Sequence, residues 1–355
     1  MKLFAIIMAG GVGSRFWPRS KKKNPKQLLK IFGENTMIQD TVARISSLCP
    51  KENILIVTNE AQRDGVSEQL PDIPLENIIV EPFGRNTAAC IGLASIIIQE
   101  RASDAVTFVL PADHIIKDTE NFVKTLKSAA QFAIENPALV TIGIGPTRPE
   151  TGYGYIQIDE DSGRSDVFKV LTFAEKPNYD TAVNFIKSGD FFWNSGMFIW
   201  RTATILDEIK QHMTDLYEGL IQIRAQINSP DFTNILSNIY GQLRSISIDY
   251  GIMEKSENVF LVKGKFSWSD VGSWEAVYQL SEKDEEGNVK LGSIYTDMVL
   301  DSYIYSPDKF TAVIGLDNII VINYKDTLLV CKRDKAQDVK NIIDHLKLNK
   351  LNDYR

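Results

Sequence analysis

The feature that most constrains this chain is a short apolar run followed at once by glycines and then by positive charge. Leu3–Ala9 is continuously apolar, which predicts a buried strand. Gly10, Gly11 and Gly13 follow, and glycine permits a sharp turn in which the backbone can approach a ligand closely. The basic loop, residues 15–33, then carries seven Lys and Arg residues and no Asp or Glu. This combination favours a triphosphate, held by backbone N–H groups and by cationic side chains.

Two familiar phosphate-binding motifs do not fit this turn. A Walker A loop requires Gly-Lys-Ser/Thr after four intervening residues, and the turn lacks it. The dinucleotide motif G-x-G-x-x-G requires a third glycine where this chain has Phe16. An ordinary turn with a solvated basic loop remains the alternative, because glycine turns are common after the first strand of α/β folds.

Composition argues against several classes of protein. The 355 residues give room for a large domain and a small one, and 44% hydrophobic with 24% charged residues is typical of globular proteins. A net charge of −7 argues against nucleic acid as a partner. The three cysteines and three histidines are scattered, so we expect reduced thiols in the cytoplasm and neither a disulfide framework nor a zinc site. We expect no signal peptide and no membrane span, since no apolar run reaches roughly 18 residues.

Apolar runs alternate with amphipathic segments along the first half of the chain. Residues 53–58 and 77–80 are predicted to form strands, and residues 36–48 and 60–70 helices. This alternation implies an α/β fold with a mostly parallel, Rossmann-like sheet. A later segment, Ser245–Ile252, is predicted to form another strand. Ligands of such sheets bind at the carboxyl ends of the strands, so polar residues that follow strands are candidates for the site.

The pattern changes near the end of the chain. The charged, turn-like segment 282–288 is the predicted boundary between a domain of residues 1–284 and one of residues 289–355. Short apolar runs then recur at regular spacing, which indicates a stack of β-helical turns. A final amphipathic helix is predicted over residues 335–348.

Three polar residues in the first half follow predicted strands. Asn86 and Thr87 stand at the start of a predicted helix, where they could cap the helix or read a base or ribose. Asp113 lies at the end of the predicted strand Ala105–His114. A carboxylate there could hold Mg²⁺ beside a polyphosphate, or could cap a helix or form an ion pair. The residues alone leave these alternatives open.

Four further motifs follow later in the chain. Tyr153 is flanked by glycines, which suits a sugar site as well as a hairpin turn. Glu175 and Lys176 end a predicted strand and could bind sugar hydroxyls and a sugar phosphate, although adjacent Glu-Lys pairs are commonplace. Asn194 interrupts an aromatic strand, and such a small polar break indicates close approach to a ligand. Asp270 opens an amphipathic helix, which alone is only a helix-start signal.

The stretch GGVGSRFWPRSKKKNPKQ, residues 10–27, resembles the activation loop of the sugar-nucleotide pyrophosphorylases, in particular of their mannose-1-phosphate guanylyltransferase branch. The later motifs resemble those of the family and occur in the same order, within residues 2–275. The resemblance implies a GT-A-like nucleotidyltransferase domain followed by a small left-handed β-helix-like domain with a terminal helix. It also implies a Mg²⁺-dependent homodimer that transfers GMP from GTP to mannose 1-phosphate. Larger members continue into an isomerase domain, so isomerase activity is not expected here.

The same resemblance implies a role for each candidate residue. Arg15 and Lys26 would be catalytic, and Asp113 and Asp270 would bind the metal ion. The residues implied to bind the nucleotide are Ala9, Gly10, Gly11, Gly13, Ser14, Asn86, Thr87 and Asp113. Those implied to bind the sugar phosphate are Gly152, Tyr153, Glu175, Lys176 and Asn194.

Two alternatives to this function remain open. The enzyme could use another sugar 1-phosphate or another NTP, because a single hydroxyl or base contact decides each choice. The chain could also be a catalytically silent sugar-nucleotide sensor on the same fold. The loss of Arg15, Lys26, Asp113 or Asp270 would mark such a sensor, and all four are present.

Overall fold

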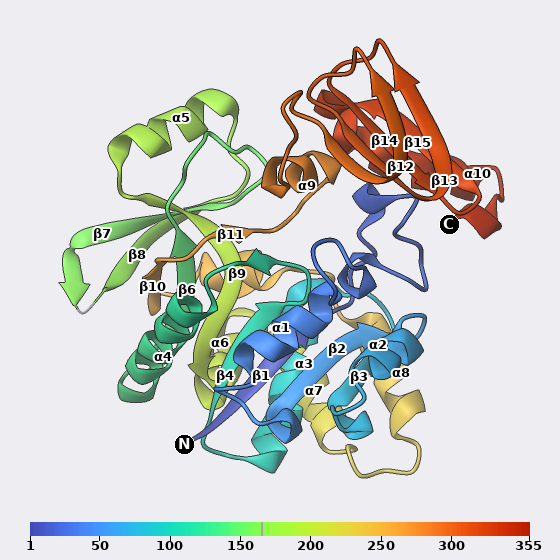
Figure 1. Cartoon of the computed structure of the whole chain (residues 1–355). Coiled ribbons are helices and arrows are strands. Elements are labelled where there is room, and N and C mark those ends of the chain that lie inside the picture. Colours follow the sequence, from blue (N-terminus) through green and yellow to red (C-terminus); the bar gives the residue numbers. More distant parts are fainter. Residues whose placement is uncertain (165) are drawn as a thin grey trace.

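The computed structural model describes residues 1–164 and 166–355. Its centre is a nine-stranded sheet with the strand order β3-β2-β1-β4-β9-β6-β10-β8-β7 (Figure 1). These strands are β1 Lys2–Met8, β2 Ile54–Asn59, β3 Ile78–Glu81, β4 Ala105–Pro111, β6 Leu139–Ile144, β7 Tyr155–Arg164, β8 Val167–Ala174, β9 Phe191–Arg201 and β10 Val259–Gly264. A separate two-stranded ribbon pairs β5, Ile115–Ile116, with β11, Trp268–Ser269.

The half of the sheet that contains the N-terminal strand is parallel, as the alternation of strands and helices predicts. Strand β1 pairs in parallel with β2 and with β4, and β2 pairs in parallel with β3. Strand β9 lies antiparallel between β4 and β6, and it joins this half to the parallel pair β6–β10. The first strand is continuously apolar because both of its faces are covered: Ile6 and Ile7 are fully buried although they point to opposite faces.

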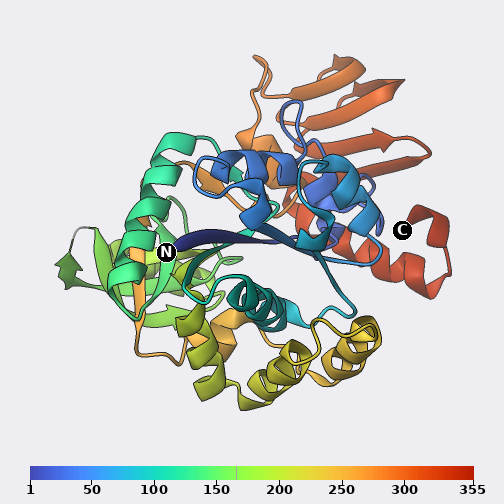
Figure 2. The same ribbon diagram turned by 90° about the horizontal axis from the view of Figure 1, so that it is seen from below.

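Helices cover both faces of the central sheet (Figure 2). They are α1 Met37–Ile45, α2 Arg63–Gln69, α3 Asn86–Arg101, α4 Thr119–Glu135, α5 Tyr179–Ser188, α6 Thr202–His212, α7 Thr214–Arg224 and α8 Phe232–Gln242, with α9 Trp274–Leu280 and α10 Lys340–Leu348 farther along the chain. On one face α1 and α4 share a hydrophobic core with Ile7 of β1, and on the other α3, α6, α7 and α8 share a core with Ile6. Among the described residues, no helix is both long and apolar enough to cross a membrane.

The C-terminal part forms a second sheet in the order β12-β13-β14-β15 (Figure 1). Its strands are β12 Val289–Asp297, β13 Tyr303–Ile314, β14 Ile319–Tyr324 and β15 Thr327–Lys332. Val289 pairs in parallel with Tyr303, and Tyr303 pairs in parallel with Ile320, so the chain advances by one coil between neighbouring strands. This confirms the predicted β-helical turns, although β15 returns antiparallel to β14. The second sheet begins where the second domain is predicted to begin, and the division into domains stays a prediction.

A third hydrophobic core joins the C-terminal sheet to the basic loop. It combines Phe16 and Trp17 of the basic loop with Trp274 of α9 and with Tyr303 and Ile320 of the C-terminal sheet. The ring centroids of Phe16 and Trp274 lie 5.0 Å apart. The C-terminal sheet therefore shares a core with the loop that follows the first strand.

The prediction of a strand at Ser245–Ile252 is wrong. The chain there contains no strand, and it enters a π-helical turn, η5, at Asp249–Met253. Its backbone bonds to the start of α3 instead of to a sheet, because the Ile248 N–H donates to the Thr87 hydroxyl at 2.8 Å. The apolar alternation reflects burial among helices, where Ile248 and Ile252 are fully buried.

Candidate active site

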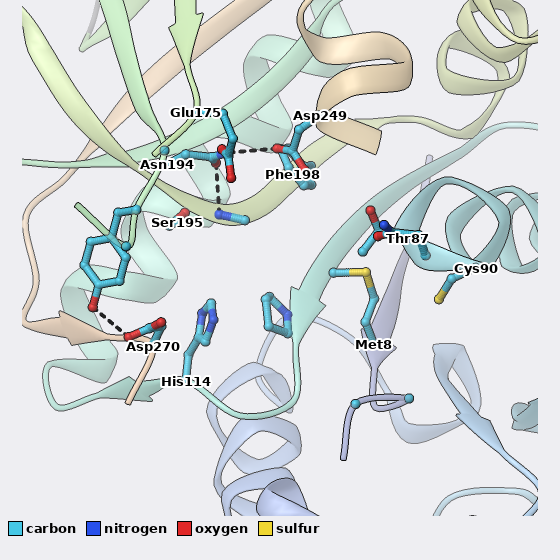
Figure 3. A pocket seen from close by; sticks show the side chains of 18 of the residues that line it. Met8, Thr87, Cys90, His114, Glu175, Asn194, Ser195, Phe198, Asp249 and Asp270 are labelled. Atoms are coloured by element: carbon cyan, nitrogen blue, oxygen red, sulfur yellow. Dashed lines mark hydrogen bonds between the residues drawn. The ribbon is translucent and has the colours of Figure 1, made fainter. Parts of the chain in front are cut away.

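A pocket of about 560 Å³ lies at the carboxyl ends of the central strands, where ligands of such sheets bind. The predicted site residues that line it are Gly10, Gly11, Asn86, Thr87, Gly152, Tyr153, Glu175, Lys176, Asn194 and Asp270. The pocket has two ends (Figure 3). Thr87 and Cys90 lie at what we call the α3 end, and Glu175, Asn194 and Asp249 lie at the β9 end.

Six predicted site residues are not part of the pocket lining. They are Ala9, Gly13, Ser14, Arg15, Lys26 and Asp113. Arg15 is exposed, whereas Ala9 and Lys26 are buried. Lys26 and Asp113 are nevertheless linked to the lining through Asp270, as described below.

The glycine turn after β1 is held by two glutamine side chains. The Gln27 Nε2 donates to the carbonyl of Ala9 at 2.6 Å and to that of Gly11 at 3.0 Å. The Gln62 Nε2 donates to the same Gly11 carbonyl at 3.2 Å. These amides satisfy the carbonyl groups of the turn from behind. The turn is therefore held in place although it belongs to no strand or helix, and its Gly10 and Gly11 line the pocket.

Lys26 connects the two predicted metal ligands. Its buried ammonium donates to Asp113 Oδ2 at 2.9 Å and to the main-chain carbonyl of Asp270 at 2.5 Å. The Tyr153 hydroxyl donates to Asp270 Oδ1 at 2.6 Å and orients that carboxylate at the edge of the pocket (Figure 3). Burial raises the pKa of Asp113, but the nearby positive charge of Lys26 and the hydrogen bonds to the carboxylate together bring the pKa below its ordinary value. Asp113 is therefore ionised at neutral pH.

His114 supports the site and adds no charge to it. The Trp268 Nε1 donates to His114 Nδ1 at 3.1 Å, and the two rings meet edge-on with centroids 5.3 Å apart. Burial lowers the pKa of His114 in spite of the opposing effect of Asp113 and Asp270. The imidazole is therefore neutral at pH 7.

The β9 end carries a set of hydrogen-bonding and charged groups. The Asn194 Nδ2 donates to Asp249 Oδ1 at 2.7 Å, and the Lys176 ammonium pairs with Glu175 Oε1 at 2.6 Å. A Cβ at Gly154 would lie 2.5 Å from Glu175 Oε2, so a larger residue there would make the carboxylate move from its present position. Burial raises the pKa of Asp249, and the hydrogen bond from Asn194 partly offsets this. Such a set of groups suits a polyhydroxylated ligand that carries a phosphate.

The α3 end contains a buried carboxylate that the sequence analysis did not single out. Glu81 ends β3, is 7% exposed and lines the pocket. The Tyr240 hydroxyl of α8 donates to its Oε1, and a Cβ at Gly10 would lie 3.4 Å from its Oε2. Burial raises the pKa of Glu81 to about 7, and the hydrogen bond from Tyr240 partly offsets this. Glu81 thus presents hydrogen-bond acceptors beside the glycine turn.

The capping alternative for the start of α3 is not what the structure shows. Helix α3 begins at Asn86 without a side-chain cap. Asn86 has a positive φ of 64°, and its Oδ1 accepts from the Thr87 N–H at 2.8 Å. Both residues line the pocket, and their roles in nucleotide binding stay predictions.

The charge count of the basic loop overstates how much positive charge is free to meet a ligand. Arg19 is only 8% exposed, and its guanidinium lies 4.4 Å from the centre of the Tyr305 ring. Lys26 is buried and hydrogen-bonded as described. Arg15 is exposed and lies close in sequence to the glycine turn, so it can meet a ligand from solvent.

Comparison with known proteins places both parts of the chain. The family profile described as nucleotidyl transferase matches residues 4–287, and that described as MannoseP isomerase/GMP-like beta-helix domain matches residues 299–346. Mannose-1-phosphate guanylyltransferase RfbM of Salmonella typhimurium is 41% identical over 360 residues, which cover 100% of this chain and 74% of the relative. A mannose-1-phosphate guanylyltransferase of Escherichia coli is 37% identical over 364 residues, which cover 100% of this chain and 75% of the relative.

A solved structure agrees with these relatives. It comes from Thermus thermophilus, is described as a mannose-1-phosphate geranyltransferase, and superposes with a TM-score of 0.87 at 32% identity. The match covers 98% of this chain and 100% of the other, so it includes the C-terminal sheet as well as the central one. The similarity therefore extends over the whole arrangement of the two sheets and is not limited to a common nucleotide-binding core. The chain belongs to the nucleotidyl transferase family and, within it, to the mannose-1-phosphate guanylyltransferases.

Proposed function

We propose that this chain transfers GMP from GTP to mannose 1-phosphate, which yields GDP-mannose and pyrophosphate. The observation that carries this proposal is one continuous pocket with a hydrogen-bonding group at each end. Glu81 and Thr87 lie at the α3 end, and Asn194 and Glu175 lie at the β9 end. The glycine turn and Asp270 also line this pocket, where the phosphates of two substrates would meet. Membership of the mannose-1-phosphate guanylyltransferases supports the assignment.

The reaction needs positive charge and correct positioning more than it needs a general base. A phosphate monoester has a second pKa of about 6, so mannose 1-phosphate is mostly dianionic at pH 7 and can attack the α-phosphorus of GTP directly. The obstacle is the repulsion between two polyanions. Catalysis then consists of in-line positioning and electrostatic stabilisation. Lys176 would hold the sugar phosphate, and Arg15 and Lys26 would neutralise the leaving pyrophosphate.

The carboxylates of the site fit the divalent metal ion that nucleotidyltransferases of this family typically use, and we propose Mg²⁺. Proteins bind Mg²⁺ through one or two carboxylates together with substrate phosphates. Asp113 is ionised, and the ammonium of Lys26 already contacts both Asp113 and Asp270. Within residues 1–164 and 166–355, no cluster of three His, Cys, Asp or Glu could hold a metal ion alone, so substrate oxygens would complete the set. When bound, Mg²⁺ supplies positive charge that stabilises the phosphate oxygens.

Glu81 is proposed to select guanine. The Watson–Crick edge of guanine presents N1–H and the 2-amino group, two adjacent donors that match the two oxygens of a carboxylate. Adenine presents an acceptor at N1 and lacks the 2-amino group, so it would set a lone pair against Glu81. Tyr240 orients the carboxylate for this contact by donating to Oε1.

The β9 end is proposed to bind the mannose. Asn194 and Asp249 form one hydrogen-bonded pair, and Glu175 lies beside them in the pocket. Together they offer amide donors and carboxylate acceptors to the sugar hydroxyls. Lys176, the residue after Glu175, lines the same pocket and would bind the sugar phosphate.

Substitution of Gly13 tests the position of Lys26. Gly13 has a φ of 68°, and a Cβ there would lie 2.4 Å from the Cβ of Lys26. Gly13→Ala should lower the free energy of unfolding by about 1–3 kcal/mol and, by displacing Lys26, lower kcat/KM for GTP by about 100-fold. Thermal unfolding and pyrophosphate release would measure the two effects.

Gly33→Ala is a matched control for this substitution. Gly33 also has a positive φ, of 70°, but a Cβ there would have no neighbour within 4 Å. It should lose stability in the same way and keep kcat/KM for GTP within a factor of about two of the wild-type value. Equal losses of activity in the two variants would show that backbone strain, and not the displacement of Lys26, is responsible.

Pyrophosphate release from the purified protein tests the proposed function. GTP, ATP, UTP and dTTP would each be combined with the 1-phosphates of mannose, glucose and fucose in the presence of Mg²⁺. Release confined to GTP with mannose 1-phosphate would confirm both substrates, and release with another pair would keep the mechanism but change the substrate. No release from a folded protein that binds GDP-mannose would favour a silent sensor.

We also propose that the chain forms a homodimer, as expected from the resemblance. Large hydrophobic side chains are exposed on the C-terminal sheet and its loops, among them Met298 at 73% and Phe310 at 71%. Exposed apolar patches of this kind are typical of protein interfaces. Light scattering should give twice the chain mass of 39.9 kDa, and Phe310→Asp should reduce it. A wild-type mass of 39.9 kDa would contradict the proposal.

A further inference from the structure

The basic loop contacts the C-terminal sheet through an arginine that faces away from the site. Arg19 is 8% exposed, and its guanidinium lies 4.4 Å from the ring centre of Tyr305 and 6.0 Å from that of Tyr324. Tyr305 belongs to β13 and Tyr324 to β14. The Arg19 Nη2 donates to the carbonyl of Lys30 at 2.6 Å, so the same guanidinium ties together two ends of the loop.

A tryptophan provides a second attachment on the same side of the loop. The Trp17 Nε1 donates to the carbonyl of Tyr354 at 2.8 Å, near the C-terminal end of the described chain. The Trp17 carbonyl accepts from Trp274 Nε1 at 3.1 Å. Trp17 is 7% exposed and belongs to the third core, so its hydrogen bond from Trp274 is shielded from water.

The opposite side of the loop carries the residues that the proposed mechanism needs. The Lys26 ammonium lies 5.3 Å from the ring centre of Phe16 and donates to Asp113 and to the main-chain carbonyl of Asp270. Arg15 immediately precedes Phe16. The loop is thus held between the site on one side and the C-terminal sheet on the other.

We propose that Tyr305 is a positioning residue for catalysis: by holding Arg19 against the C-terminal sheet, it sets Arg15 and Lys26 at the triphosphate. This role rests on the function proposed above and goes beyond it, because it assigns part of GTP binding to the C-terminal sheet. Tyr305 lies on β13 of the C-terminal sheet and is not part of the pocket lining, so it would act through Arg19. The alternative is that Tyr305 only adds to the packing of the third core.

The two accounts differ in which kinetic constant changes. A displaced loop should weaken the contacts to the triphosphate and leave the sugar end intact, because the β9 end is built from other strands. Tyr305→Leu should therefore raise KM for GTP about 10-fold and keep KM for mannose 1-phosphate within about two-fold. Tyr305→Phe keeps the aromatic face under the guanidinium and should restore the wild-type KM for GTP.

Two further variants make the test specific. Tyr295→Leu removes a tyrosine of β12 that is 51% exposed and should change neither KM. Arg19→Lys keeps the charge but loses the planar stacking group, so it should reproduce the rise in KM for GTP if Tyr305→Leu does not fold.

Cleavage by trypsin gives a readout that does not depend on activity. Lys22 and Lys23 are exposed at the tip of the loop. The loosened loop of Tyr305→Leu or Arg19→Lys should be cut there at least several-fold faster than in the wild type and in Tyr295→Leu.

The outcomes separate this proposal from the proposed function. A rise in KM for GTP alone, with faster cleavage at Lys22 and Lys23, supports the positioning role. Unchanged constants, or equal rises in both KM values, overturn it. If the wild type does not turn over GTP with mannose 1-phosphate, the proposed function fails. The cleavage rates then still decide whether the Arg19 contact holds the loop, and rates equal to wild type would overturn that as well.

Discussion

Asp113→Asn is expected to lower kcat by at least about 1,000-fold in the presence of saturating Mg²⁺. The carboxylate of Asp113 is ionised, and its side chain is 37% exposed although it pairs with the Lys26 ammonium at 2.9 Å, so it can also reach a metal ion beside the phosphates. An amide of the same shape removes that charge, and transition-state charge stabilisation by a metal ion contributes several kcal/mol. Pyrophosphate release at several Mg²⁺ concentrations would measure the loss.

The control is a substitution of the same kind outside the site. Asp207 is exposed on α6, and Asp207→Asn should keep wild-type kinetics. Circular dichroism should show that both variants are folded. Normal Mg²⁺-dependent turnover by Asp113→Asn would mean that the metal assignment is wrong.

Glu81→Gln is expected to lower kcat/KM for GTP by about 100-fold and to weaken the choice of base. A site built to hydrogen-bond a particular group discriminates strongly against analogues that lack it, since buried polar atoms are then unpaired. ITP lacks only the 2-amino group of GTP. The wild type should prefer GTP to ITP by at least about 10-fold, and Glu81→Gln should bring this ratio close to one.

The pH dependence gives an independent check on Glu81. Its pKa is raised to about 7 by burial, so the free enzyme gains the carboxylate as the pH rises through that value. The carboxylate is the form that accepts from guanine. The KM of the wild type for GTP, divided by that of Glu81→Gln, should therefore decrease as the pH is raised from about 6 to about 8. A ratio independent of pH, together with an unchanged GTP/ITP preference, would remove Glu81 from base recognition. Glu76→Gln, at an exposed position of the same segment, is the matched control.

The same raised pKa makes a prediction about stability. The native state of a buried Glu with a raised pKa binds protons more tightly than the unfolded state. Its contribution to stability is full below the ordinary pKa of 4.5 and is lost as the pH rises through about 7. The Tm of Glu81→Gln minus the Tm of the wild type should therefore be larger at about pH 8 than at about pH 5.

The strands of the central sheet could be predicted because their cause is local. Continuous apolar runs such as the one before Gly10 are buried on both faces, and the turn that follows contains three glycines. The same reasoning failed at Ser245–Ile252, since alternating isoleucines are buried equally well among helices as in a sheet. An alternation as short as that of Ile246 and Ile248 does not distinguish these two kinds of burial.

The part of the site that was missed depends on partners distant in the sequence. Glu81 accepts a hydrogen bond from Tyr240, which lies 159 residues away in the sequence, and Asp249 accepts one from Asn194, which lies 55 residues away. The rule that polar residues at the ends of strands are candidates would have selected Glu81, but nothing local marks its burial. Arg19 shows the reverse error, because a count of charges cannot reveal a guanidinium stacked on a tyrosine of another sheet.

The measurement that tests the central claim most directly is the fate of the α-phosphate of GTP. The protein would be incubated with Mg²⁺, mannose 1-phosphate and GTP labelled with ³²P at either the α- or the γ-position. We predict that the α-label appears in GDP-mannose and the γ-label in pyrophosphate, because the sugar phosphate attacks the α-phosphorus. Release of the γ-label as inorganic phosphate, with the α-label left in GDP, would show hydrolysis at the wrong bond and would contradict the account.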